Sequence, residues 1–251
     1  MYKILANTLF FGKNVVYVPE CHSTNTLLVE MVEKANMMEG TLVITDRQLK
    51  GRGQRGNSWE AEPGLNLTFS ILLRPSFLAV AEQFFLTQAI STGLADYWQS
   101  RTHLGIKIKW PNDIVINDKK VTGILIENSL AGNSIQQSVV GIGVNINQER
   151  FANPKATSLK QLVGHPFDLQ QELNSLLEKL EYRYLQLRAG NRDELQREYL
   201  NQLYRIGEKH FFRINGKPVE GMIVGIDPIG QLKLVMEGGE RTFGLKEIEF
   251  L

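Results

Sequence analysis

The chain has 251 residues, of which 43% are hydrophobic and 22% are charged, an ordinary composition for a globular protein. The formal charge is only +1, so no overall basic field argues for a nucleic-acid partner. Residues 1–12 lack the features of a signal peptide, and no apolar run has the length of a membrane span. One cysteine, Cys21, forbids an internal disulfide and fits a reducing compartment. We therefore expect a cytoplasmic protein without a membrane partner.

Hydrophobic periodicity and turn residues predict an α+β domain over residues 1–206. Alternating or continuous apolar runs predict strands at residues 15–18, 41–45, 65–73, 106–110, 114–116, 121–127 and 139–146. Helical spacing predicts helices that follow Ser23, span residues 78–101, run from Asp168 to Gly190 and cover residues 192–205. Residues 117–118, Asn-Asp, are a hairpin signal between two of the strands.

The pattern changes at residue 207. Short alternating runs follow, separated by turn residues at Asn215-Gly216, Asp227-Pro228, Gly230 and Gly238-Gly239. This pattern predicts a separate C-terminal domain, residues 207–251, that folds as a small β-barrel.

Residues 51–56 read Gly-Arg-Gly-Gln-Arg-Gly and combine bare backbone amides with fixed positive charge, which suits phosphate or carboxylate oxygens. The string matches the dinucleotide fingerprint G-x-G-x-x-G, but no helix is predicted at Gly56 and Ser76 stands near the position of the ribose-binding acid. A P-loop is excluded because Asn57-Ser58 follows Gly56. We interpret the segment as an anion-binding loop between two strands.

Three further polar clusters have both a structural and a functional interpretation. Ser23-Thr24-Asn25 fits a helix N-cap, or a set of donors and acceptors for a neutral polar ligand. Residues 109–113, Lys-Trp-Pro-Asn-Asp, fit a turn, or a site where Asp113 holds Mg²⁺. Residues 120–125, Lys-Val-Thr-Gly-Ile-Leu, fit a charged sheet edge, or a lysine that reaches a phosphate. For Trp59, the residues alone favour packing in the core over stacking on a flat ring.

Together these segments resemble the biotin protein ligases, in the family's order and approximate spacing. The resemblance rests on Ser23-Thr24-Asn25, Gln48, Gly51-Arg52-Gly53, residues 109–113, residues 120–125 and Gly141-Ile142-Gly143-Val144-Asn145. It covers nearly the whole chain and implies a mixed or antiparallel sheet with packed helices, followed by an SH3-like β-barrel. It also implies that biotin and ATP form biotinyl-5′-AMP, and that a lysine of a biotin carboxyl carrier domain then accepts the biotinyl group.

The resemblance further implies roles for individual residues. Lys120 and Arg52 would be catalytic, and Asp113 would hold Mg²⁺. The implied biotin-binding residues are Ser23, Thr24, Asn25, Gln48, Gly51, Arg52, Gly53, Gln54, Lys120, Gly123 and Leu125. The implied ATP-binding residues are Arg55, Trp59, Lys109, Asn112, Asp113 and Asn145.

This chain departs from the family pattern in two places. Many relatives carry a basic residue where Gln54 stands beside the adenylate, so this chain lacks a charge there. The Ser-Thr-Asn segment begins at Ser23, which leaves no room for the DNA-binding domain of bifunctional relatives, and we expect a ligase that is not a repressor. A homodimer is possible. The alternatives are a lipoate or octanoate ligase, and a non-catalytic protein that binds an adenylate.

Overall fold

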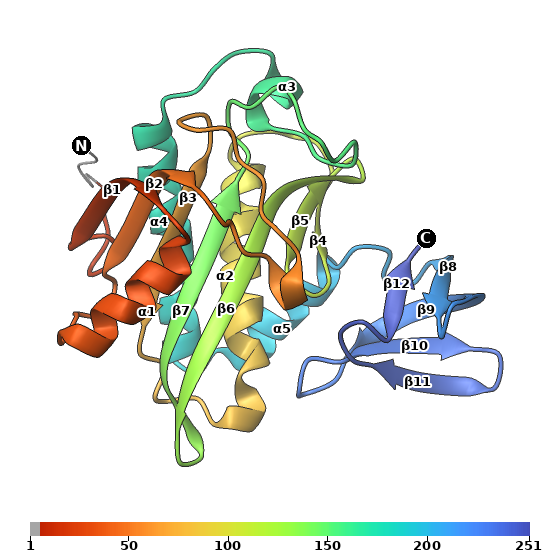
Figure 1. Cartoon of the computed structure of the whole chain (residues 1–251). Coiled ribbons are helices and arrows are strands. Elements are labelled where there is room, and N and C mark those ends of the chain that lie inside the picture. Colours follow the sequence, from red (N-terminus) through yellow and green to blue (C-terminus); the bar gives the residue numbers. More distant parts are fainter. Residues whose placement is uncertain (1–5) are drawn as a thin grey trace.

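The computed structural model describes residues 6–251, which form a large sheet domain and a small C-terminal β-domain (Figure 1). The large sheet has the strand order β1-β2-β3-β7-β6-β5-β4, with β1 parallel to β2 and all other neighbours antiparallel. Its strands are β1 Val15–Cys21, β2 Leu42–Gln48, β3 Leu67–Leu73, β4 Ile106–Lys109, β5 Asp113–Ile116, β6 Lys119–Ala131 and β7 Ser134–Val144. The mixed sheet expected from the sequence is confirmed.

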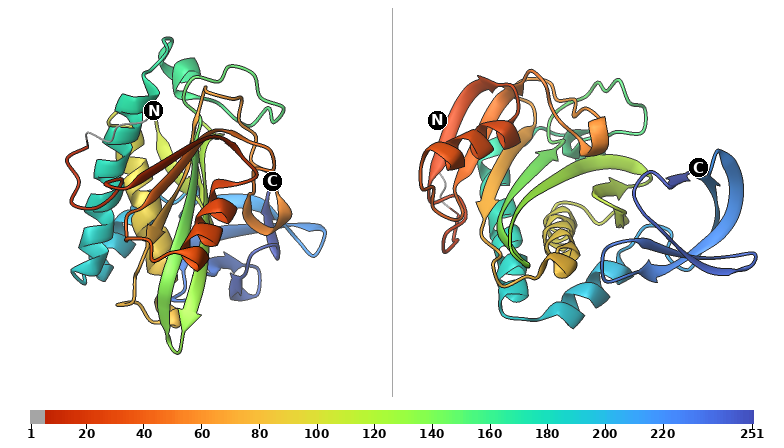
Figure 2. Two further views of the ribbon diagram at one scale, coloured as in Figure 1. Left: turned by 60° about the vertical axis from the view of Figure 1, so that its left-hand side comes forward. Right: turned by 60° about the horizontal axis from the view of Figure 1, so that its bottom comes forward.

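Helices cover both faces of this sheet (Figure 2). Helix α1, Thr24–Lys34, packs on β2, β3 and β7, whereas α2, Phe84–Gln99, packs on the opposite face against β4 and β5. Helices α4, Leu169–Arg188, and α5, Arg192–Asn201, lie behind α2, and α3, Leu159–Val163, is a single short turn. Within residues 6–251 no helix is both long and apolar enough to cross a membrane.

The sequence patterns explain the central elements better than the peripheral ones. All seven residues of β3 are buried because the strand lies mid-sheet with both faces covered, and its apolar run is typical of that position. The helix expected over residues 78–101 is shorter, because a separate 3₁₀ turn, η2 at Val80–Glu82, precedes α2. Strands β6 and β7 extend beyond the predicted ranges into a hairpin whose β6 side is largely exposed, whereas Ile135 and Ser138 of β7 stay buried.

The C-terminal domain is a five-stranded antiparallel sheet with the order β11-β10-β9-β8-β12. Its strands are β8 Lys209–Ile214, β9 Lys217–Ile226, β10 Leu232–Met236, β11 Gly239–Phe243 and β12 Ile248–Phe250. The predicted C-terminal β-domain is therefore confirmed, while its boundary at residues 206–207 stays a prediction. The indole Nε1 of Trp110 donates to the carbonyl of Gly230 at 2.9 Å, and a Cβ at Gly230 would lie 2.4 Å from the ring of Phe84. The two domains thus meet at a close backbone contact that only glycine permits.

A buried carboxylate fixes the segment that precedes β1. Glu181 of α4 is only 4% exposed and accepts backbone N–H groups from Leu9, Phe10 and Phe11 at 2.6–2.8 Å. Phe11 is fully buried, so this anchor also determines how the first strand enters the core.

Replacing Glu181 with alanine leaves three backbone donors without their acceptor. We expect Glu181→Ala to lower the free energy of unfolding by about 3 kcal/mol, measured by urea denaturation. Glu178→Ala is the matched control, since this exposed carboxylate on the same helix accepts a single N–H, from Asn7. Equal stability losses in the two variants would contradict the assigned role of Glu181.

Candidate functional site

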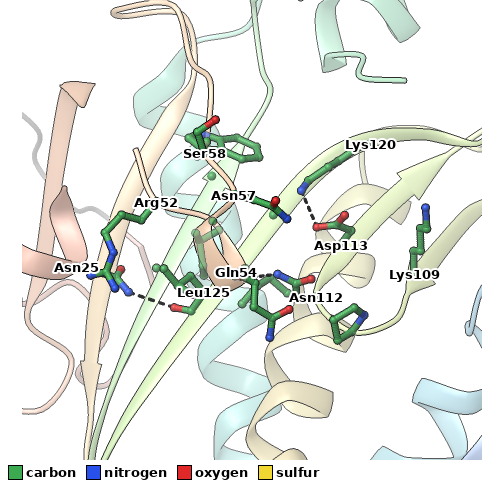
Figure 3. A pocket seen from close by; sticks show the side chains of 18 of the residues that line it. Asn25, Arg52, Gln54, Asn57, Ser58, Lys109, Asn112, Asp113, Lys120 and Leu125 are labelled. Atoms are coloured by element: carbon green, nitrogen blue, oxygen red, sulfur yellow. Dashed lines mark hydrogen bonds and ion pairs between the residues drawn. The ribbon is translucent and has the colours of Figure 1, made fainter. Parts of the chain in front are cut away.

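A cavity of about 450 Å³ opens on the sheet face that carries α1, beside the C-terminal domain. Its walls come from the start of α1, the end of β2, the loop over residues 51–59, the β4–β5 turn, β6, β7 and residues 245–250. Figure 3 shows side chains from α1, the loop, the β4–β5 turn and β6 gathered around this cavity. The fold therefore brings all four polar clusters identified in the sequence to one place.

The floor of this cavity is made of glycines. Gly123 of β6 pairs with Gly143 of β7, and Leu125 pairs with Gly141. A Cβ at Gly143 would lie 2.2 Å from the Trp59 ring, and one at Gly141 would lie 2.1 Å from Asn25 Oδ1. These three glycines, the glycine floor, let Asn25 and Trp59 lie directly on the sheet backbone.

A hydrogen-bonded polar network forms one end of the cavity. The backbone N–H and hydroxyl of Thr24 both donate to Gln48 Oε1, at 2.8 and 3.2 Å. Ser70 Oγ of β3 lies 2.8 Å from Thr24 Oγ1 and 2.6 Å from Asn25 Oδ1. Ser23 has extended backbone immediately before α1, so it occupies the predicted N-cap position. Side chains held this firmly suit a neutral ligand head that both donates and accepts hydrogen bonds.

The loop over residues 51–59, called the Gly-Arg loop below, is a compact turn and not a helix start, as predicted. Its 3₁₀ turn, η1 at Gln54–Gly56, is closed by Gly53 N–H donating to the Asn57 carbonyl at 2.7 Å. The amide of Gly53 is therefore used within the loop, which limits the expected array of free amides. Arg52 reaches back to Glu127 of β6, with 2.6 Å between Nη2 and Oε1.

The opposite end of the cavity is rich in cations. Lys120 Nζ lies 2.7 Å from Asp113 Oδ1 and 5.5 Å from the centre of the Trp59 ring. The charged residues that line the cavity are Arg52, Lys109, Lys120, Lys155, Lys246, Asp113 and Glu249. Apart from Arg52, which pairs with Glu127, four cations against two carboxylates leave an excess of positive charge, which favours an anionic ligand.

Lys109 lies in a low-dielectric part of this end. Burial lowers the pKa of its ammonium group, nearby Asp113 opposes that shift, and Lys155, Arg205 and Lys120 reinforce it. Its Nζ also lies 5.1 Å from the centre of the Phe250 ring in β12. An incoming anion would relieve the burial cost, so this lysine is suited to pairing with a ligand phosphate.

Most of the predicted site residues line the cavity. These are Ser23, Thr24, Asn25, Gln48, Arg52, Gly53, Gln54, Trp59, Lys109, Asn112, Asp113, Lys120, Gly123 and Leu125. Trp59 is half-buried on the glycine floor, so the expectation of core packing was wrong. The cause is the pair of glycines at 123 and 143, which provide a flat surface outside the core.

Three predicted residues have other positions. Gly51 lies behind the lining, where a Cβ would meet the Trp59 carbonyl at 2.3 Å. Asn145 is buried, and its amide donates to the carbonyls of Thr157 and Lys120 at 3.0 and 3.4 Å, so it supports the cavity wall from behind. The side chain of Arg55 lies outside what the structure describes. The ATP-binding roles of Asn145 and Arg55 stay predictions.

Sequence reasoning missed Ser70, Glu127 and Lys155. Ser70 and Glu127 hold Asn25 and Arg52, and Lys155 lines the cavity because its carbonyl accepts the Lys120 backbone N–H at 2.7 Å. Glu127 could have been found from the alternation of side chains along a strand, since residues 123, 125 and 127 share one face of β6. Ser70 and Lys155 have no comparable signal, because tertiary folding alone brings β3 and residues 152–158 to this site.

Comparisons with known proteins place this arrangement in a family. The profile of the Biotin/lipoate A/B protein ligase family matches residues 17–145, just over half of the chain. The biotin--[acetyl-CoA-carboxylase] ligase of Paracoccus denitrificans is 31% identical over 239 residues, which span 90% of this chain and 98% of that protein. The bifunctional ligase/repressor BirA of Bacillus subtilis is 29% identical over 96% of this chain and 75% of its own length.

The fold agrees with solved structures. Biotin protein ligase from Aquifex aeolicus, in complex with biotin and ATP, superposes with a TM-score of 0.78 at 26% identity. The match covers 95% of this chain and 99% of that one. The chain belongs to the Biotin/lipoate A/B protein ligase family. Within that family it is a biotin protein ligase, an ATP-dependent enzyme.

The glycine floor can be tested by adding one methyl group. Gly143→Ala places a Cβ where the Trp59 ring now lies, so we expect the ring to move and adenylate formation to fall by on the order of 100-fold. Gly105→Ala is the control, because a Cβ there has no neighbour within 4 Å. Pyrophosphate exchange measures the effect, and an unchanged rate in Gly143→Ala would contradict the role of the floor.

Proposed function

We propose that both half-reactions of biotin ligation take place in this cavity. In the first, a carboxylate oxygen of biotin attacks the α-phosphorus of ATP, the bond to the bridging oxygen breaks, and pyrophosphate leaves. In the second, a lysine amine of the acceptor attacks the activated carbonyl, and AMP leaves. The observation that carries this proposal is the polarity of the cavity, which has a neutral hydrogen-bonding end and a cationic end joined by the glycine floor.

The neutral end fits the ureido head of biotin. Ureido N–H groups need acceptors and its carbonyl needs donors, and Thr24, Asn25 and Gln48 supply both in a fixed arrangement. Their mutual hydrogen bonds hold the side chains in place before the ligand binds, which reduces the entropy lost on binding.

The cationic end fits the reacting groups. Joining a carboxylate to a phosphate brings like charges together, and fixed cations offset that repulsion as the transition state forms. In this proposal Lys120 lies between the two anions, exchanging part of its contact with Asp113 for the substrates, while Lys109 and Asn112 contact the nucleotide. Trp59, on the floor beside Lys120, offers a flat face to the adenine ring.

A magnesium ion also fits this end of the cavity. Within the described residues no cluster of three or more His, Cys, Asp or Glu side chains could hold a metal by itself. Mg²⁺ commonly binds through one or two carboxylates together with substrate phosphates, and Asp113 supplies a carboxylate that faces the cavity. When bound, the ion would neutralise phosphate charge and help pyrophosphate to leave.

The loop at residues 51–58 protects the intermediate in this proposal. An acyl-adenylate hydrolyses readily, and a loop that covers it excludes water until the acceptor arrives. Gln54 contributes no charge at this point, so the intermediate is held by hydrogen bonds and by the cations of the sheet.

The acceptor in this proposal is the biotin carboxyl carrier domain of a biotin-dependent carboxylase in the cytoplasm. Its lysine has to enter the cavity, whose lining includes the loop and residues 245–250. Homodimer formation and the absence of a DNA partner remain predictions from the sequence.

Lys120 is the most direct target for testing the chemistry. Lys120→Ala removes the cation next to the reacting groups and leaves Asp113 unpaired, so we expect adenylation to fall by on the order of 10²-fold or more. Transfer of labelled biotin to a carrier domain, with Mg-ATP, measures the overall reaction. Lys119→Ala is the control because this neighbouring lysine is exposed. Near-normal pyrophosphate exchange by Lys120→Ala would refute the role, and support of exchange by lipoate instead of biotin would refute the substrate.

A further inference from the structure

Glu127 contacts residues of two of the four sequence clusters, although it does not belong to any of them. One carboxylate oxygen, Oε2, accepts from Asn25 Nδ2 at 2.8 Å, and the other, Oε1, lies 2.6 Å from Arg52 Nη2. A single side chain on β6 therefore connects the start of α1 to the Gly-Arg loop.

The first contact fixes which way the Asn25 amide points. Asn25 Nδ2 faces two groups that only accept, the Glu127 carboxylate and the Leu125 carbonyl, and the latter is 3.2 Å away. Asn25 Oδ1 faces the Ser70 hydroxyl at 2.6 Å. A flipped amide would set its oxygen against a carboxylate, so the network leaves Oδ1 as the acceptor available to a ligand N–H.

The second contact fixes the loop. Arg52 also donates to Thr26 Oγ1 at 3.3 Å, and in Figure 3 its guanidinium lies beside Asn25 and away from Lys120 and Asp113. Arg52 thus ties the loop to α1 and β6 at the neutral end of the cavity. The pair is about half exposed on the Arg52 side, so solvent screens it and its effect is small but measurable.

We propose that Glu127 is a positioning residue with two separable functions. Its acceptor oxygen orients Asn25 toward the N–H groups of the ligand head, and its negative charge anchors Arg52 and thereby the loop. The ligand-head part rests on the proposed biotin reaction, whereas the loop part is a property of the protein without substrates.

Two substitutions separate the functions. Glu127→Gln keeps an oxygen for Asn25 but removes the charge that holds Arg52, so we expect a KM for biotin within about twofold of wild type. Glu127→Leu removes both, and we expect its KM for biotin to rise about tenfold or more with kcat less affected, because a hydrogen bond to a charged acceptor is lost. The readout is pyrophosphate exchange at saturating Mg-ATP.

Limited trypsin digestion of the substrate-free protein reports on the loop. Cleavage after Lys50, Arg52 or Arg55 should be about two- to fivefold faster in both Glu127 variants. Arg52→Gln should speed cleavage at the two remaining sites similarly, and combining it with Glu127→Gln should add nothing. Glu20→Gln is the control, because Glu20 pairs with Arg47 on the same sheet but does not line the cavity.

The outcomes are distinct. The proposal is overturned if Glu127→Gln raises the KM for biotin as much as Glu127→Leu does, or if both variants match wild type in KM and cleavage rate. If Glu127→Leu does not fold, the glutamine variant and the Arg52 double mutant still decide the loop function. Failure of the wild-type protein to form an adenylate would instead refute the proposed function.

Discussion

The absence of side chains at three positions on β6 and β7 is the constraint on which the site depends. Gly123, Gly141 and Gly143 leave the backbone of two paired strands bare, and Asn25 and Trp59 occupy the space that Cβ atoms would fill. A ligand in the cavity therefore lies against Asn25 and Trp59, which cover these strands, and its ends contact groups from other elements. The other lining residues of the cavity come from elements that surround these three glycines.

The surrounding elements make the two ends of the cavity chemically different. At one end, α1 and β2 supply an amide and hydroxyl network whose members fix one another. At the other end, the β4–β5 turn and β6 supply an ion pair between Asp113 and Lys120. The C-terminal domain completes this end, because Phe250 packs near Lys109 and the Gly230 carbonyl accepts from Trp110. The small domain therefore contributes to the geometry of the site itself.

The sequence predicted the elements and clusters well where local chemistry decides them. The buried run of β3, the glycines of the Gly-Arg loop and the turn after Lys109 all carry their own signals. The position of Trp59 could not be predicted, because the surface that receives it comes from strands more than 60 residues later. Glu127 and Ser70 were missed for a similar reason, since their partners lie on α1 and in the loop and become neighbours only after the sheet forms.

The most direct test of the central claim is a crystal structure with biotin and ATP bound. The account predicts that the ring system of biotin lies next to Asn25 and Thr24, that the ligand chain passes beside Trp59, and that the reacting phosphate lies beside Lys120. A second cavity of about 350 Å³ lies nearby, lined in part by Phe84, Ile126 and Ile229. Either ligand bound in that second cavity, with the first cavity left empty, would contradict the account.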